Sequence, residues 1–330
     1  MRILLMQTTT NENIMSTTKK KGFDLYGHVN KIIKEQLGKI KDGTCHYLLD
    51  TSLTAPFNPI SGTQYTRTNW LLLYIVTSIK SYRFNAWATY KQVTGAGGTL
   101  RDAKGKSEQI IYFNRLYYID GKKADYASYS ALYKSLSLEQ RIKRLSTKSF
   151  LKYSNIFNWN NIDGLDHLIE NIDNSAENIE EKNTTAKEIL DYCGADIVIE
   201  KRNVASYKPS RDIVSMPQRK HFKSEDKYYS TLFHELGHWT LHKSRLNRII
   251  NHEKIEEVAF EELVAELTSA YLCAKCGMLS EVNDAAAYID HWLGALENDE
   301  TFFYRAIQKA QDASDFILEQ VNINQKAIAV

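Results

Sequence analysis

The chain has 330 residues, 43% of them hydrophobic and 25% charged, which is the composition of a globular protein large enough for two domains. Its net charge of +2 conceals an asymmetry. Residues 1–165 hold 24 Lys and Arg against 11 Asp and Glu, a balance of +13, which leaves −11 for residues 166–330. Only the first half is therefore suited to nucleic acid or another polyanion, although a solvated basic surface without a partner would give the same count. Four scattered cysteines exclude a secreted disulfide scaffold, so a reduced, cytoplasmic protein is expected.

The first half begins with a predicted flexible basic leader, residues 1–22, within which Met15 is an alternative start to Met1. Its opening MRILLM is too short for a signal peptide. Residues 23–40 have the apolar spacing of an amphipathic helix, and Pro56, Pro59 and Gly62 then predict a structured loop. The apolar run at 69–80 is about half the length of a membrane span, so a buried helix and no membrane contact are expected. An exposed basic loop at 101–106 and a strand in EQIIYFNRLYYID follow, whereas 124–150 has no clear periodicity.

The second half begins after an acidic segment, 166–183, that is predicted to be a linker. A helix near 184–193 precedes two short apolar strands, in ADIVIEK and RDIVSMP. Ser224 is suited to cap the next helix, and a second helix is predicted at 254–275, with two or three more to the end of the chain. The expected fold class is α+β in two domains, residues 23–165 and residues 184–330.

The sequence His234-Glu235-Leu236-Gly237-His238 is an HExxH motif. Residues at i and i+4 share one helix face, so the two imidazoles can chelate one Zn²⁺. Glu235 is then placed to act as general base on a metal-bound water. The apolar, helix-compatible flanks and the preceding strand strengthen this interpretation. Zinc is the default metal for these ligands, with Mn²⁺ or Co²⁺ as alternatives.

A catalytic zinc needs a third protein ligand. His242 lies too close to His238 for the pattern in which a third histidine binds, so it is expected to be exposed or to support a ligand. The following helix offers Glu261, Glu262 and Glu266. We predict that Glu262 binds the metal and that Glu266, one turn away, orients a ligand histidine. Glu261 points about 100° away and is expected to be solvated. A surface stripe of carboxylates is the alternative.

Aromatic and basic residues alternate between residues 65 and 123, a mixture typical of proteins that bind single-stranded nucleic acid. The alternative is that at least half of these aromatic side chains belong to the core. The residues predicted to contact DNA are Tyr65, Arg67, Asn69, Trp87, Lys91, Arg101, Lys104 and Lys106.

These motifs together resemble the ArdC-type antirestriction proteins of conjugative plasmids and related mobile elements. The similarity lies in NPISGTQYTRTNWLLL and WATYKQV of the first half, and in DIVSMP, YYSTLFHELGHWT, SRLNR and FEELVAEL of the second. One departure is the segment around Arg67, where the family usually has glycine, and another is Leu241, also usually glycine.

The resemblance implies an N-terminal domain that binds single-stranded DNA and a C-terminal zincin-like metallopeptidase domain of the gluzincin type. It further implies that His234, His238 and Glu262 bind zinc, that Glu235 is the base, and that Tyr65, Arg67 and Asn69 belong to the DNA-binding signature. The expected function is protection of incoming mobile-element DNA from host restriction, with a restriction protein as a possible target. Two alternatives stay open: a cytoplasmic zinc peptidase that acts on an acidic protein without a DNA role, and a purely structural zinc.

Overall fold

The computed structural model describes residues 24–45, 55–102, 104–170, 179–280 and 288–328. The predicted leader, with both possible start sites, and much of the predicted linker lie outside the described residues. Within them, the helices and strands expected from apolar periodicity are largely confirmed.

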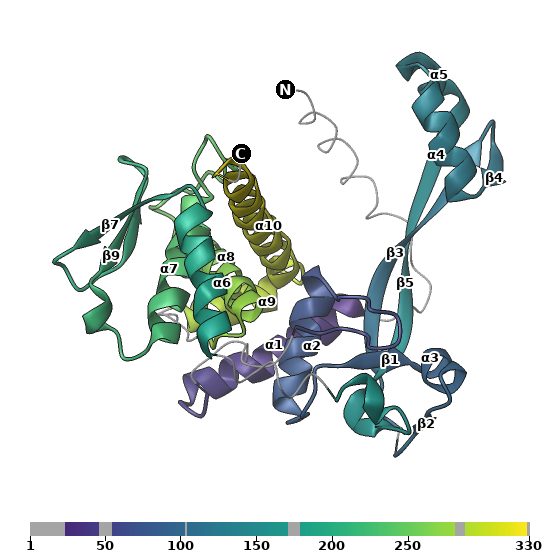
Figure 1. Ribbon diagram of the computed structural model, residues 1–330, viewed down its shortest axis with the longest axis horizontal. Helices are drawn as coiled ribbons and strands as arrows, with labels where there is room; N and C mark the ends of the chain where they lie inside the picture. The colour runs from purple at the N-terminus through teal and green to yellow at the C-terminus, as the bar shows by residue number, and fades with distance from the viewer. Residues whose placement is uncertain (1–23, 46–54, 103, 171–178, 281–287, 329–330) are drawn as a thin grey trace.

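The first half is built on an antiparallel sheet with the strand order β1-β5-β3-β4. Two helices precede this sheet, a small helix follows β1, and two more lie between β4 and β5 (Figure 1). The elements are α1 (Leu25–Lys41), α2 (Arg67–Ile79), β1 (Trp87–Thr89), α3 (Tyr90–Gly95), β2 (Thr99–Leu100), β3 (Glu108–Ile119), β4 (Lys122–Ala124), α4 (Tyr126–Ser135), α5 (Leu138–Arg144), β5 (Leu145–Asn158) and β6 (Ile162–Asp163). Strands β2 and β6 form a separate antiparallel pair.

The segment that lacked a clear pattern, residues 124–150, contains α4, α5 and the start of β5. Helix α4 has no buried residue, so its sequence needs no apolar stripe and the periodicity that reveals a helix is missing. Local capping defines both helices instead. Asp125 accepts a hydrogen bond from the backbone of Ser128, and Ser137 forms a capping box with Gln140.

In its described residues, the second half combines a three-stranded sheet, order β7-β9-β8, with five α-helices. Strands β7 and β9 run parallel, and β8 pairs antiparallel with β9 at the edge. The elements are α6 (Ile179–Tyr192), β7 (Asp196–Glu200), β8 (Ser206–Lys208), β9 (Ile213–Pro217), α7 (Glu225–Trp239), α8 (Ile255–Cys276), α9 (Ile289–Asn298) and α10 (Phe302–Ile328). The predicted strands and the Ser224 cap are confirmed, whereas the short strand β8 was not expected.

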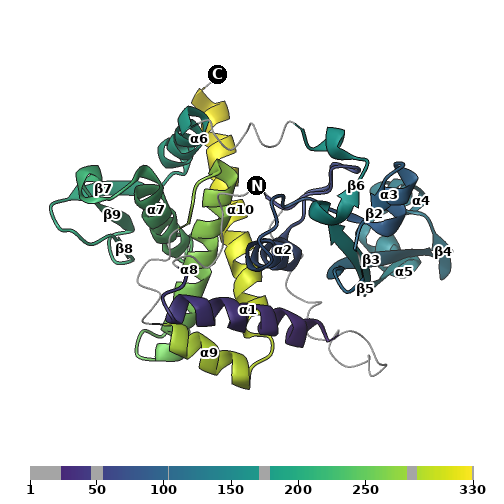
Figure 2. The same ribbon diagram turned by 90° about the horizontal axis from the view of Figure 1, so that it is seen from below.

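The main hydrophobic core joins the two halves of the chain. Side chains of α1 and α2 pack in one cluster with those of α8, α9 and α10. Figure 2 shows these helices gathered together, with α1 beside α9. The rings of Trp70 and Tyr271 meet at the junction, with centroids 3.9 Å apart. A second cluster lies between α6, α7 and the three-stranded sheet. The sequence changes character near residue 166, but the core is not divided there.

Among the described residues, no helix combines the length and the apolar character needed to cross a membrane. The apolar run that begins at Trp70 lies inside α2, where nine residues are buried by packing against the rest of the protein.

Candidate functional site

Helix α7 carries the HExxH motif into the interior. Ser224 caps its N-terminus by accepting a hydrogen bond from the backbone N–H of Lys227, and acidic residues occupy the first turn. Gly237 allows helix α8 to approach closely, because a Cβ atom there would lie only 3.0 Å from the Cα atom of Ala265. The sequence around the motif thus sets both the start of the helix and its distance from its neighbour.

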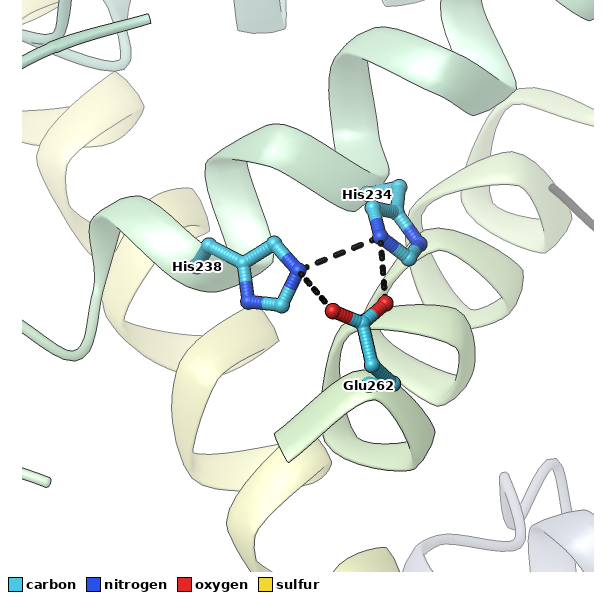
Figure 3. A group of neighbouring side chains, drawn as sticks. All are labelled: His234, His238 and Glu262. Atoms are coloured by element: carbon cyan, nitrogen blue, oxygen red, sulfur yellow. Dashed lines mark hydrogen bonds and ion pairs between the residues drawn. The ribbon is translucent and has the colours of Figure 1, made fainter. Parts of the chain in front are cut away.

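His234, His238 and Glu262 converge on one point between α7 and α8 (Figure 3). The two Nε2 atoms are 3.2 Å apart. Glu262 places one carboxylate oxygen 3.4 Å from Nε2 of His234 and the other 3.6 Å from Nε2 of His238. A tetrahedral metal with ligands at about 2.0–2.1 Å requires ligand atoms about 3.3 Å from one another. The three side chains therefore fit a divalent metal ion.

Carboxylates from α8 lie beside the other nitrogen of each imidazole. Nδ1 of His234 lies 3.3 Å from Glu266, and Nδ1 of His238 lies 3.4 Å from Glu261. A proton on Nδ1 leaves Nε2 unprotonated and facing the shared point, which is the tautomer that a metal requires. The predicted position of Glu266 agrees with this geometry.

The expectation that Glu261 is solvated was wrong, because its side chain is only 5% exposed. Arg248, from the loop after α7, donates to both carboxylate oxygens of Glu261. Arg248 also donates to the carbonyl of Gly237 and to the hydroxyl of Thr240, at the end of α7. The ion pair thus connects the C-terminus of one helix to the carboxylate that holds His238. Arg248 is the last residue of the SRLNR motif, but nothing in that motif indicated that it would pair with Glu261.

The carboxylates control protonation of the cluster. Burial lowers the pKa of His234, but Glu266 and Glu262 outweigh it and raise this pKa well above its ordinary value. Burial likewise lowers the pKa of His238, while hydrogen bonds to Glu261 and Glu262 raise it to about 9. Burial raises the pKa of Glu262, yet the two histidines hold it well below its usual range. The carboxylates therefore favour positive charge at the point where the two imidazoles and Glu262 meet.

The predicted base Glu235 is buried, and its Oε2 accepts a 2.7 Å hydrogen bond from the backbone N–H of Tyr207 in β8. The Tyr207 hydroxyl donates to Asp212, which is also paired with Arg245. The unexpected edge strand is therefore connected to the motif through Glu235. His242 lies apart from the cluster, with its Nδ1 2.8 Å from the Ser244 hydroxyl, in agreement with its exclusion as a ligand.

Several residues predicted to contact DNA make contacts within the protein. Trp87 is fully buried and Tyr65 is 9% exposed, with its hydroxyl donating to the Trp87 carbonyl. The Asn69 amide makes two hydrogen bonds to the backbone of Ile111. In this conformation the two rings cannot stack on bases, and the Asn69 amide has its partners within the protein. Arg67 is half-buried and its guanidinium donates to side chains of α10.

The other four predicted residues are accessible. Lys91, Arg101 and Lys104 are exposed, and Lys106 is half-buried. Arg101 is paired with Asp163 at 3.3 Å, although its side chain keeps 61% of its surface exposed. Among the eight residues predicted to contact DNA, the structure thus separates two buried aromatic side chains from an accessible basic edge.

Two family models match the chain. Residues 24–157 match the N-terminal domain of the anti-restriction factor ArdC, and residues 184–309 match a zincin-like metallopeptidase. Two proteins of Escherichia coli, both named DNA primase TraC, are 32% identical over 82% and 80% of this chain. The aligned part is only 25% and 17% of their length, so the chain spans a quarter or less of these relatives. Protein y4eC of Sinorhizobium fredii is 28% identical, over 90% of this chain and 92% of its own.

The fold is also similar to crystal structures of the antirestriction protein ArdC from plasmid R388. The metal-free form matches with a TM-score of 0.68 and 30% identity, over 91% of this chain and 98% of that one. The Mn(II)-bound form matches over the same shares, with a TM-score of 0.66 and 29% identity. Agreement over both halves, together with the two family models, shows that this chain belongs to the ArdC family of antirestriction proteins.

Proposed function

We propose that the protein binds single-stranded DNA through its basic half, residues 23–165, and protects incoming mobile-element DNA from host restriction. The observation that carries this proposal is the match along almost the whole length of an antirestriction protein. The balance of +13 in residues 1–165 supports it, because Lys and Arg neutralise phosphates and release counterions. The exposed side chains of Lys91, Arg101 and Lys104 add further accessible charge in this half.

We further propose that residues 184–330 hold Zn²⁺ through His234, His238 and Glu262. The ligand set and its spacing support zinc, although Mn²⁺ suits the same site and is the metal named for a relative. A zinc ion bound here would polarise a carbonyl group and acidify water. Glu235 would take up a proton beside it, while Glu266 and Glu261 hold the two imidazoles in the required tautomer.

A second candidate function is peptide hydrolysis in the cytoplasm, directed at a host restriction protein or at an acidic protein unrelated to DNA. The feature that favours it is Glu235, since a purely structural metal site requires ligands but no base. The buried position of Glu235 next to an edge strand is consistent with proton transfer in a site shielded from bulk water.

Titration of fluorescent single-stranded and duplex oligonucleotides, at several salt concentrations, tests the main proposal. The intact protein and its Glu235→Gln variant should both prefer the single strand, with an affinity that falls as salt rises. This result would make DNA binding independent of the metal chemistry. Equal binding of both DNA forms, or no salt dependence, would contradict the proposal, and absence of binding would favour an acidic protein substrate instead.

A further inference from the structure

Strands β3 and β5 form a long two-stranded ribbon that the metal site does not use. They pair from Glu108↔Ile156 to Ile119↔Leu145, without interruption. At about 3.4 Å per residue, the twelve pairs span roughly 40 Å. Figure 1 shows the ribbon extending away from the helices that carry the metal site, with β4, α4 and α5 at its far end.

One face of this ribbon is covered near its tip. Residues at odd positions of β3 point to that face, and Tyr117 packs there against two rings of α4. The ring centroids of Tyr117 and Tyr126 are 5.2 Å apart, and those of Tyr117 and Tyr129 are 4.9 Å apart. These contacts place α4 on the odd-numbered side, so the even-numbered side of β3 faces away from that helix.

Toward the tip, the even-numbered face of β3 carries two tyrosines, and the neighbouring strands place lysines beside them. Tyr112 is paired with Lys152 and Tyr118 with Lys123, while Lys148 lies opposite Leu116 between them. Tyr112 is 44% exposed, Tyr118 is half-buried, and the three lysines are exposed. None of the residues 112–118 or 146–152 is acidic.

This pattern meets the two requirements of single-strand binding, which are accessible ring faces for bases and cations for phosphates. The distance from Tyr112 to Tyr118 along the strand is about 20 Å, enough for several nucleotides. Residues 112–152 contain nine Lys and Arg against three Asp and Glu, so the whole arm attracts a polyanion. The buried rings of Trp87 and Tyr65 cannot provide such a platform.

We propose that this face of the β3–β5 ribbon, defined by Tyr112, Tyr118, Lys123, Lys148 and Lys152, is the principal binding strip for single-stranded DNA. Bases stack on the two tyrosines while the lysines follow the phosphates. The inference rests on the proposed function and deepens it, because it moves the main contact from the family signature at 58–69 to the protruding arm.

Fluorescence anisotropy with a labelled oligothymidine and the full chain tests the strip. Replacing one base-stacking ring by alanine weakens binding at least about fivefold, so Tyr112→Ala/Tyr118→Ala should weaken it by about 25-fold or more. Tyr112→Phe/Tyr118→Phe should keep near wild-type affinity, because the rings remain. Lys123→Ala/Lys148→Ala should reduce the slope of log affinity against log salt by about 1.4, at about 0.7 per lost phosphate contact.

Matched controls use the same residue types outside the strip. Tyr126 is 64% exposed but lies on the covered side, and Lys201 and Lys220 are exposed in the second half. Tyr126→Ala should bind DNA within twofold of the wild type. Lys201→Ala/Lys220→Ala has the same charge change as the lysine variant of the strip, yet it should keep the salt slope.

The possible outcomes separate the inference from the function on which it rests. If the wild-type protein does not bind the single strand, the proposed function fails first. If the wild type binds and the alanine variants of the strip bind equally well, the strip is wrong while DNA binding stands. An equal loss for the phenylalanine and alanine variants would also overturn stacking, since only the latter remove the rings.

Discussion

Replacing Glu261 by glutamine tests how the metal site is supported. The substitution preserves the shape of the side chain and removes its charge, next to Arg248 and His238. Both side chains of the ion pair are at least 92% buried, and removal of one partner from a buried pair costs about 3–5 kcal/mol. Glutamine still offers an oxygen to Arg248, so we expect the lower value, about 3 kcal/mol of unfolding free energy.

The same change should weaken metal binding. Loss of the carboxylate that orients a ligand histidine typically lowers metal affinity about 10- to 100-fold. We therefore expect Glu261→Gln to bind Zn²⁺ at least 10-fold more weakly in a competition titration with a chromogenic chelator. Urea unfolding of the metal-free protein measures the stability loss separately.

Glu257→Gln is the matched control, because Glu257 lies on the same helix and forms an exposed ion pair with Lys254 at 3.2 Å. This control should keep both the metal affinity and the stability of the wild type. If Glu261→Gln behaves like the control in both assays, the role assigned to Glu261 and Arg248 is refuted.

Three further changes probe packing, backbone strain and the metal. Gly237→Ala should lower the free energy of unfolding in urea by about 1–2 kcal/mol, because the new methyl group meets Ala265. Gly294→Ala, where no atom lies within 4 Å of the new methyl group, should raise it. Equal effects would exclude the packing explanation. Arg67 has a φ of 53°, so Arg67→Gly should be about 1 kcal/mol more stable than Arg67→Ala, and the reverse order would exclude strain. When free metal is present at about 100 times its Kd, adding a chelator should lower the thermal midpoint of the protein by roughly 4 °C. The midpoint of His234→Ala should not change. An equal shift in both proteins would argue against binding at this site.

The geometry of the candidate metal cluster was largely predictable from the sequence because its information is local. The spacing of His234 and His238 places both on one face of a helix, and Glu262 and Glu266 follow from the same rule on the next helix. Glu261 could not be assigned in this way. Its burial depends on Arg248, whose loop returns to the end of α7, and helical geometry alone gives no information about such a contact.

The residues proposed to bind nucleic acid were less predictable, for a different physical reason. Aromatic side chains serve cores and stacking platforms equally well, so alternation with basic residues does not distinguish Trp87, in the core, from exposed Tyr112. Strand register and tip packing separate the two classes, and both need the folded chain. The glycine that the family usually has at the position of Arg67 has a local explanation, because Arg67 adopts the positive φ that glycine favours.

The core shared by α1, α2 and α8–α10 also has a consequence for regulation. A fragment cut near residue 165 would expose Trp70 and much of α2 to water, so the first half should not fold alone. If the chain melts as one cooperative unit, a nucleic acid held by the ribbon raises the resistance of α7 and α8 to opening, although it never touches them. Binding of nucleic acid to the ribbon would then slow amide hydrogen exchange in α7 and α8.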